Sequence, residues 1–367
     1  MIRGAERLVL FALLMAWALS ACTGPWSKPA PCPCQQSTSQ PRGSNPEIER
    51  QDDRLVTIAA GGDILLDRGV KTTALLAGDP YYPLSTLHEL FGSADVTIAN
   101  LEGALTAADT PYAKRYIFKA DPSYAGLLKK AGLNILSLAN NHSYDYGRDA
   151  LLETARHLEQ AGILALGAGE NLDAALSPRY LTIKNIRIAL IGVVTMQLEG
   201  LTWRPEAPNP GLAVEELVVK KIQDAKTQAD FVILSVHWGN EFAPEANADQ
   251  LRWAQIFRRA GADVVFGHHP HVIQPIEEIN GRWVFYSLGN FVFDQTRPEQ
   301  RQALLARLEI TKRGIQSVSA IPLTINDARP MPADEASIAD ILERLKKYSS
   351  NLEFTREGGL IRCAPKR

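Results

Sequence analysis

Short apolar segments, rich in β-branched residues and ending in Gly or polar residues, constrain the fold of this chain more than any other feature. The segments are at 55–60, 95–100, 134–139, 231–236 and 263–266. Runs of this kind are typical of buried strands. Helical patterns of apolar residues lie between them, at 121–132, 147–161 and 248–260. We therefore expect an α/β protein.

Polar side chains stand where these strands are expected to end. They are Asp63, Asn100 with Glu102, Asn140-Asn141-His142, His237 and His268-His269-Pro270-His271. Ligands of α/β proteins bind at this end of the strands. The three imidazoles of 268–271 are hard to explain by packing, because neutral rings need polar partners and charged rings repel one another. We therefore favour metal ligation over the alternatives, which are a His-rich polar turn here and an Asn-rich turn at 140–141.

Turn residues predict antiparallel strand pairs in the same chain. The pairs are expected at 180–183 with 187–193, at 273–279 with 282–286, and at 304–310 with 315–323. Asn280-Gly281, in the second pair, is typical of a type I′ turn. The folded domain is expected over 54–330, and residues 331–367 are expected to form a C-terminal helix followed by a tail.

Residues 1–22 have the features of a secretory signal. Arg3 and Arg7 precede the apolar run Leu8–Leu19, which is shorter than the about 20 apolar residues of a spanning helix. Leu19-Ser20-Ala21-Cys22 resembles the bacterial lipobox. This resemblance implies that Cys22 is lipidated and anchors an extracytoplasmic protein of the cell envelope in a membrane. A plain signal peptide and a membrane anchor are the alternatives.

Residues 23–53 are rich in Pro, Ser and Gln and poor in apolar residues, which predicts a flexible tether. The tether contains Cys32 and Cys34, and Cys363 lies near the other end of the chain. A Cys-x-Cys pair alone is no zinc framework, and a disulfide is open without an assigned pairing. The formal net charge is −2 and the basic residues are dispersed, so there is no electrostatic basis for nucleic-acid binding.

The polar strand ends together offer carboxylate, amide and imidazole donors and no thiolate. The candidate metal ligands are Asp63, Glu102, Asn141, His237, His269 and His271. This mixture suits Mn²⁺, Fe or Zn²⁺, and it exceeds what one tetrahedral site uses, which indicates two divalent ions. Two ions can activate a water and stabilise both oxygens of an in-line displacement, and phosphoester hydrolysis fits such a site best.

Six short motifs, in this order along the chain, resemble those of one family. They are Gly62-Asp63, Asn100-Leu101-Glu102, Ala139-Asn140-Asn141-His142, His237-Trp238-Gly239, Gly267-x-His269-Pro270-His271 and Ser287-Leu288-Gly289-Asn290-Phe291. The set looks like the poly-γ-glutamate capsule synthesis protein family (CapA/PgsA type) of the calcineurin-like metallophosphatase superfamily, and the resemblance covers 55–323. It implies a four-layer α/β/β/α metallophosphatase-like sandwich, with two facing sheets and helices outside.

The resemblance also implies how the candidate ligands are shared between two ions. Asp63 would bind the first ion and Asn141 with His237 the second, Glu102 would bridge them, and His269 with His271 would complete the pair. Two positions depart from the superfamily pattern: Leu65 stands where a His is usual, and Glu102 stands where the bridge is usually Asp. A centre with one ion is therefore the alternative.

The remaining candidate residues have catalytic or substrate-binding roles. By the same resemblance His142 would be a general acid that protonates the leaving group, with the neighbouring Asn141 in the catalytic set. Arg68, which follows Asp63 closely, and the strand-end residues Asn100 and Asn290 are the candidate substrate contacts.

Three functions follow from these observations. The first is an envelope-anchored, metal-dependent hydrolase, with phosphoester hydrolysis as the expected reaction, that acts in capsule or poly-γ-glutamate synthesis with an exopolymer synthase complex. The second is a non-catalytic envelope protein that binds an anionic polymer or a synthase partner, using Arg68, Lys114, Arg115 and Lys119. The third, less supported, is a γ-glutamyl amidase, because a metal-activated water also attacks amides.

Overall fold

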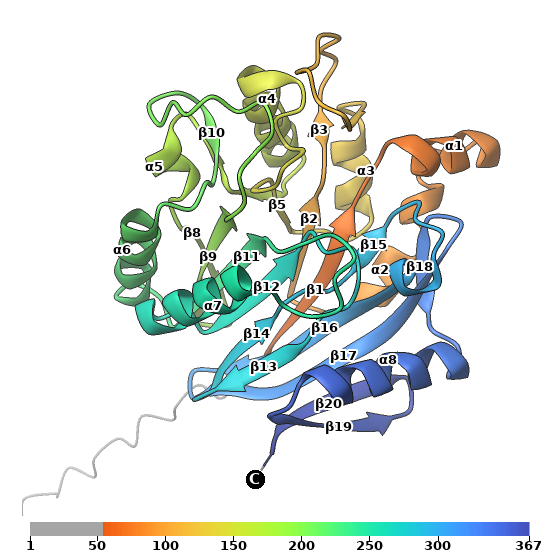
Figure 1. Cartoon of the computed structure of the whole chain (residues 1–367), viewed down its shortest axis with the longest axis vertical. Helices are drawn as coiled ribbons and strands as arrows, with labels where there is room; N and C mark the ends of the chain where they lie inside the picture. The colour runs from red at the N-terminus through yellow and green to blue at the C-terminus, as the bar shows by residue number, and fades with distance from the viewer. Residues whose placement is uncertain (1–53, 367) are drawn as a thin grey trace, which may run out of the picture. The chain divides into compact units, whose positions relative to one another are not determined.

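Two large β-sheets face each other in the computed structural model, which describes residues 54–366 (Figure 1). The expected signal segment, the lipidated Cys22, the tether, and Cys32 and Cys34 lie outside the described residues. Among residues 54–366, no helix combines the length and the apolar character that crossing a membrane requires.

The first sheet has the strand order β19-β20-β17-β16-β1-β2-β5-β6, with β15 beside β1 and β18 beside β17. Its strands are β1 (Val56–Ile64), β2 (Val96–Leu101), β5 (Ile135–Ser137), β6 (Leu164–Leu166), β15 (Asn290–Val292), β16 (Gln302–Thr311), β17 (Gly314–Asn326), β18 (Arg329–Pro332), β19 (Leu352–Glu357) and β20 (Leu360–Pro365). β1, β2, β5 and β6 are parallel, so their carboxyl ends meet at one edge.

The second sheet has the order β13-β14-β12-β11-β9-β8. Its strands are β8 (Arg179–Ile183), β9 (Ile186–Val194), β11 (Phe231–His237), β12 (Val264–His268), β13 (Ile276–Ile279) and β14 (Arg282–Phe285). β9, β11, β12 and β14 are parallel, whereas the hairpins β8–β9 and β13–β14 are antiparallel, as the turn residues predicted. Lys184, Asn185, Asn280 and Gly281 all have the positive φ that such two-residue turns require.

Helices connect the strands of both sheets. They are α1 (Arg68–Ala77), α2 (Leu87–Phe91), α3 (Tyr124–Lys130), α4 (Gly147–Gln160), α5 (Leu172–Ala175), α6 (Glu215–Lys226), α7 (Ala248–Ala260) and α8 (Glu335–Tyr348), with the 3-10 turns η1 (Tyr82–Leu84) and η2 (Pro298–Gln300). Two short strand pairs complete the described structure, β3 (Ala104–Leu105) with β4 (Lys119–Ala120), and β7 (Ala168–Gly169) with β10 (Asn209–Pro210).

The apolar residues of each sheet alternate between two layers of core. In β1, Ile58 and Ala60 face the second sheet, whereas Ala59 faces the helices of the first sheet. In β9, Ile188 belongs to the core between the sheets and Ala189 to the core beneath α6 and α7. Because side chains alternate across a strand, each sheet has two apolar faces and needs cover on both. The predicted four-layer α/β/β/α sandwich is therefore confirmed.

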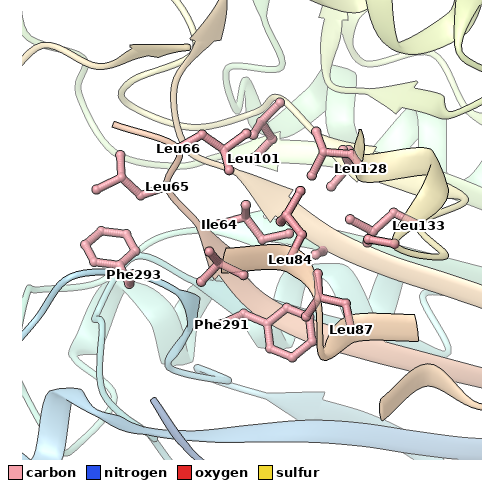
Figure 2. Packing of buried hydrophobic residues seen from close by; sticks show 14 of the residues in the cluster. Ile64, Leu65, Leu66, Leu84, Leu87, Leu101, Leu128, Leu133, Phe291 and Phe293 are labelled. Carbon is pink, nitrogen blue, oxygen red and sulfur yellow. The ribbon is translucent and has the colours of Figure 1, made fainter. Parts of the chain in front are cut away.

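The core on the helix side of the first sheet lies directly behind the strand ends. Ile64, Leu65 and Leu101 continue β1 and β2 into this cluster, where they meet Leu84, Leu128 and Phe291 (Figure 2). Leu65 and Phe291 are fully buried. This packing fixes the backbone of the two strands where they deliver Asp63 and Glu102.

The chain after residue 330 differs from the tail that the sequence suggested. The expected helix is present as α8, but β19 and β20 then form a hairpin that pairs with β17 and extends the first sheet. Leu352, Phe354 and Cys363 of this hairpin are buried in the core between the sheets. The expected tail is therefore wrong for 352–365, which complete a core layer.

Candidate functional site

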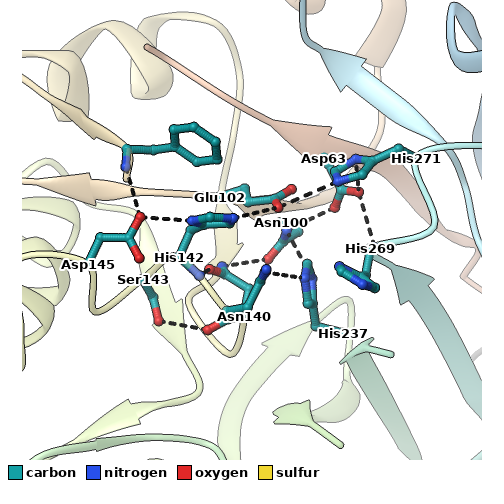
Figure 3. A network of polar contacts seen from close by, with 12 residues as sticks. Asp63, Asn100, Glu102, Asn140, His142, Ser143, Asp145, His237, His269 and His271 are labelled. Carbon is teal, nitrogen blue, oxygen red and sulfur yellow. Dashed lines mark hydrogen bonds and ion pairs between the residues drawn. The ribbon is translucent and has the colours of Figure 1, made fainter. Parts of the chain in front are cut away.

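The predicted polar residues meet at the carboxyl ends of the central strands of both sheets (Figure 3). Asp63 is in β1 and Glu102 follows β2, while His237 ends β11 and the 268–271 segment leaves β12. A register shift in β1 next to Asp63 lets this strand pair with both β2 and β15. The parallel strands of the facing sheets thus bring groups from distant parts of the sequence into one buried cluster.

The donor atoms form two groups that share one carboxylate. Asp63, Glu102 and His271 form the first group, and Glu102, His237 and His269 form the second. Within each group the ligand atoms lie within 4.8 Å of one another. Among residues 54–366, Glu102 Oε2 and His269 Nδ1 have no hydrogen-bond partner although both atoms are buried. A buried polar atom without a hydrogen-bond partner destabilises the folded state. The cluster therefore has both the donor atoms and the unsatisfied buried atoms that fit a divalent metal.

Asn141 completes the second group through its side-chain amide. Asn141 Oδ1 lies 2.8 Å from His237 Nε2. The structure therefore brings the six predicted ligands together, and their role as ligands stays a prediction.

The turn that carries His269 and His271 has an uncommon backbone. Both residues have positive φ, 95° and 56°, a region that side chains other than Gly rarely adopt and that is concentrated at functional sites. The backbone N–H of His269 donates to Asp63 Oδ2 at 3.1 Å. Gly267 is required before the turn, because a Cβ there would lie 2.1 Å from the carbonyl oxygen of Tyr286.

The pKa values of the two buried carboxyl groups, Asp63 and Glu102, are shifted in opposite directions. Burial acts to raise the pKa of Asp63, but His268, His271 and Asn100 outweigh it and hold that pKa below its usual value. Burial, together with the charges of Asp63 and Glu241, raises the pKa of Glu102 well above its usual value. A cation beside Glu102 would favour its ionised form.

Two of the imidazoles, those of His237 and His269, are held in the neutral form. Burial, followed by the neighbouring imidazoles, lowers the pKa of His237 well below its usual value. Burial and His271 lower the pKa of His269 to about 3. A neutral imidazole has the free lone pair that a metal ligand needs.

His142 is oriented by a residue that the sequence analysis missed. Its Nδ1 lies 2.8 Å from Asp145 Oδ2, and its Nε2 lies 3.9 Å from Glu102 Oε1. Lys114 Nζ forms an ion pair with Asp145 and donates to the carbonyl oxygen of Asn141 at 2.6 Å. Asp145 stands three residues after His142, on the same turn of chain, and that spacing was the signal available in the sequence. Burial lowers the pKa of His142, although Asp145 opposes this shift.

The candidate substrate contacts lie in different places. Asn100 donates to Asp63 Oδ1 at 2.8 Å and accepts from Asn140 Nδ2 at 2.9 Å, and Asn290 Oδ1 lies 2.8 Å from His271 Nδ1. Both asparagines are fully buried, so they support candidate ligands. Their contact with substrate stays a prediction that these positions do not favour.

Arg68 lies at the rim of the site. Its guanidinium pairs with Asp294 and lies over the rings of Phe118 and Phe293. Its charge opposes the rise in the pKa of Glu102, which places it close enough to influence the cluster.

His268 was not among the predicted ligands. Its side chain is buried, and its Nδ1 lies 3.3 Å from Asp63 Oδ1. Neither ring nitrogen has a hydrogen-bond partner in the described part of the chain.

A cavity of about 390 Å³ opens over the cluster. Its lining includes Asn141, His142 and His269 of the cluster, together with Glu199 and Glu241. A small ligand in this cavity would contact His142 and the second donor group together.

Comparison with known proteins identifies the family. The family model described as bacterial capsule synthesis protein PGA_cap matches residues 57–295. The PGA biosynthesis protein CapA of Bacillus subtilis is 30% identical over 331 residues, which cover 87% of this chain and 85% of that protein. A Mycobacterium tuberculosis protein named "Probable polyglutamine synthesis accessory protein" is 25% identical over 367 residues. The alignment covers 85% of this chain and 96% of the mycobacterial protein.

Among solved structures, a phosphatase of Mycoplasma pneumoniae aligns with a TM-score of 0.47 and 14% identity, covering 78% of this chain and 97% of that one. The predicted family resemblance is confirmed by the family model and the curated relatives. The chain belongs to the bacterial capsule synthesis protein family, PGA_cap.

Proposed function

We propose that this chain is a metal-dependent hydrolase of the phosphoesterase type that acts in the synthesis of capsule or poly-γ-glutamate polymer. The observation that carries the chemical part is a pair of donor groups sharing Glu102, next to a His142–Asp145 pair. The names of the related proteins support the biological part, since they refer to PGA biosynthesis and polyglutamine synthesis.

The chain's own residues would hold two divalent ions. Asp63, Glu102 and His271 would bind one, and Glu102, Asn141, His237 and His269 would bind the other. The mixture of oxygen and imidazole donors suits Mn²⁺, Fe or Zn²⁺. Bound ions would supply Lewis-acid polarisation of the substrate and a lowered pKa for an attacking water.

His142 is arranged to deliver a proton. Its Nδ1 is engaged by Asp145, which Lys114 holds in turn, so the ring is fixed with Nε2 toward the cavity and Glu102. A carboxylate at Nδ1 stabilises the protonated ring. Asp145 thus opposes the lowering of the His142 pKa by burial, and in its protonated form the ring would present an Nε2–H to the leaving oxygen.

The binding-only alternative is less well supported by the described contacts. Three of the four cations considered for an anionic polymer are already paired with carboxylates: Arg68 with Asp294, Lys114 with Asp145, and Lys119 with Asp109. The Lys114 side chain is only 3% exposed, so it cannot contact a polymer without leaving Asp145.

The proposed place of the protein is the cell envelope. The signal segment and the lipobox-like residues ending at Cys22 support a lipid-anchored, extracytoplasmic protein. The word "accessory" in the name of the mycobacterial relative supports a synthase complex as partner.

Purified chain reconstituted with Mn²⁺, Fe²⁺ or Zn²⁺ tests the chemistry. We expect hydrolysis of a generic phosphomonoester or phosphodiester that falls at least a hundredfold in Asp63→Asn and His142→Ala. His157→Ala is the matched control, because His157 lies on α4 and pairs with Glu153 outside the cluster. Equal activity of the parent and Asp63→Asn would overturn the proposal, and cleavage of a γ-glutamyl anilide alone would select the amidase.

A further inference from the structure

Glu241 forms a third donor group that the predicted ligand set does not contain. Its carboxylate and the ring nitrogens of His269 and His271 lie within 4.8 Å of one another. Glu241 follows β11 by a few residues and lines the cavity over the site. Its side chain is therefore at the solvent side of the cluster.

The loop that carries Glu241 is tied to the His269–His271 turn. The backbone N–H of the next residue, Phe242, donates to the carbonyl oxygen of Pro270 at 2.8 Å. Phe242 has a φ of 63°, a strained value for an aromatic residue. Its ring also lies 6.2 Å from that of His271. These contacts place the Glu241 carboxylate against the two imidazoles.

A buried amide holds the rest of the same loop. Gln274 Nε2 donates to the carbonyl oxygens of Ala243 and Glu245, each at 2.9 Å. Gln250 Nε2 donates to Gln274 Oε1 at 2.7 Å. Gly239 lies against Gln250, where a Cβ would come within 2.6 Å of it. The loop is thus anchored on both sides of Glu241.

The third group shares one imidazole with each of the two other groups and lies on the side of the cluster that faces the cavity. His269 also belongs to the group with Glu102 and His237, and His271 also belongs to the group with Asp63 and Glu102. Glu102 is 1% exposed and approaches from the interior, whereas Glu241 is exposed and approaches from the cavity. His269 Nδ1 is buried without a hydrogen-bond partner among residues 54–366, so this imidazole, which the third group shares with the second, has an unsatisfied atom that a ligand could meet.

We propose that Glu241 is a metal ligand, whose carboxylate lies on the solvent side of the centre within reach of both the ion assigned to His269 and the ion assigned to His271. The inference rests on the proposed metal-dependent function and adds a residue to its ligand set. A third carboxylate, beside those of Asp63 and Glu102, adds negative charge and a hard oxygen donor on the open side of the centre, which increases affinity for Mn²⁺, Fe²⁺ or Zn²⁺.

Metal binding measured without turnover tests this role. The full chain is stripped with a chelator and dialysed against a series of free Mn²⁺ concentrations, and bound metal is measured by elemental analysis. We expect Glu241→Gln to weaken Mn²⁺ binding at least tenfold or to lower its stoichiometry. Glu241→Asp should retain part of the affinity. The matched control is Glu199→Gln, because Glu199 lines the same cavity but belongs to none of the three groups.

The outcomes separate this inference from the proposed function. Parent-like binding in Glu241→Gln, with binding lost in Asp63→Asn, would overturn the role of Glu241 and leave the metal-dependent function standing. An absence of metal binding in the parent would overturn the proposed function and this inference with it. Equal far-ultraviolet circular dichroism of the metal-free proteins shows that each variant is folded. The Mn²⁺ electron paramagnetic resonance spectrum should also change in Glu241→Gln, because a ligand is lost.

Discussion

His142 owes its orientation to two charged residues, one near it in sequence and one far from it. Asp145 lies three residues after His142 in the sequence, whereas Lys114 comes from the segment before β4. The Lys114 side chain is nearly fully buried. The Lys114 ammonium satisfies both Asp145 and the carbonyl oxygen of Asn141. A surface role, such as polymer binding, was the alternative that the sequence left open for Lys114. Its burial could not be read from the sequence, because a Lys in a polar segment is usually solvated.

Lys114→Met should be strongly destabilising. It removes one partner of a buried ion pair and leaves Asp145 without its cation, a change that costs about 3–5 kcal/mol. Urea denaturation of the full chain measures the loss in the free energy of unfolding. Lys220→Met is the control, because Lys220 pairs with Asp224 on an exposed face of α6, and such a pair contributes about 0.3–0.5 kcal/mol. A parent-like value for Lys114→Met would contradict the role given to this ion pair.

Cys363 should be inert in the folded protein. Burial raises the pKa of its thiol from 9.0 to about 12, so the reactive thiolate is scarce at pH 8. The raised pKa gives the folded state an advantage that is complete below about pH 9 and is lost as the pH rises through about 12. Alkylation of the Cys363 peptide, followed by mass spectrometry, should be slow without urea and fast with it. Equal rates in both conditions would contradict the buried position.

At the scale of elements, local turn chemistry predicted several pairings correctly. The β13–β14 hairpin follows from Asn280-Gly281, and the β16–β17 pair follows from alternating segments around Gly314. The C-terminal hairpin was missed, although Gly358-Gly359 lies between β19 and β20 and is a suitable two-residue turn. Each strand buries only two alternating residues, Leu352 and Phe354 in β19 and Ile361 and Cys363 in β20, so the apolar alternation that marks a strand is brief.

Phe354→Ala tests whether this hairpin belongs to the core. The Phe354 side chain is 6% exposed and lies in the core between the sheets. Its removal should lower the free energy of unfolding by about 3–5 kcal/mol. The neighbouring Glu353 is exposed on the same strand, so Glu353→Ala should change stability by about 0.5 kcal/mol or less. Similar values for the two variants, obtained from the same denaturation series, would argue against a structural role for the hairpin.

At the scale of the whole molecule, the site depends on how the two sheets face each other. β1 and β2 deliver carboxylates from the first sheet, and β11 and β12 deliver imidazoles from the second. Both groups that contain Glu102 draw on the two sheets: Asp63 and Glu102 of the first sheet meet His271 of the second, and Glu102 meets His237 and His269. Metal binding should therefore stabilise the sandwich as a unit.

Free Mn²⁺ at about 100 times its dissociation constant should raise the free energy of unfolding by about 2.7 kcal/mol. Urea denaturation with Mn²⁺ and with a chelator measures the difference. Asp63→Asn should lose this gain, because Asp63 is fully buried within the first donor group. Glu199→Gln should retain it. The same gain in Asp63→Asn as in the parent would show that the ion binds elsewhere.

The sequence by itself determined the central parallel strands of both sheets, three antiparallel strand pairs, and the strand ends at which Asp63, Glu102, Asn141, His237, His269 and His271 stand. It could do so because apolar periodicity and turn residues are local properties of the chain. Only the tertiary structure decided three sets of contacts. Lys114 pairs with Asp145, which in turn orients His142. Asn100 and Asn290 are hydrogen-bonded to candidate ligands, and Glu241 lies within reach of His269 and His271. These contacts join residues on different strands and loops, and their distances depend on the packing of one sheet against the other.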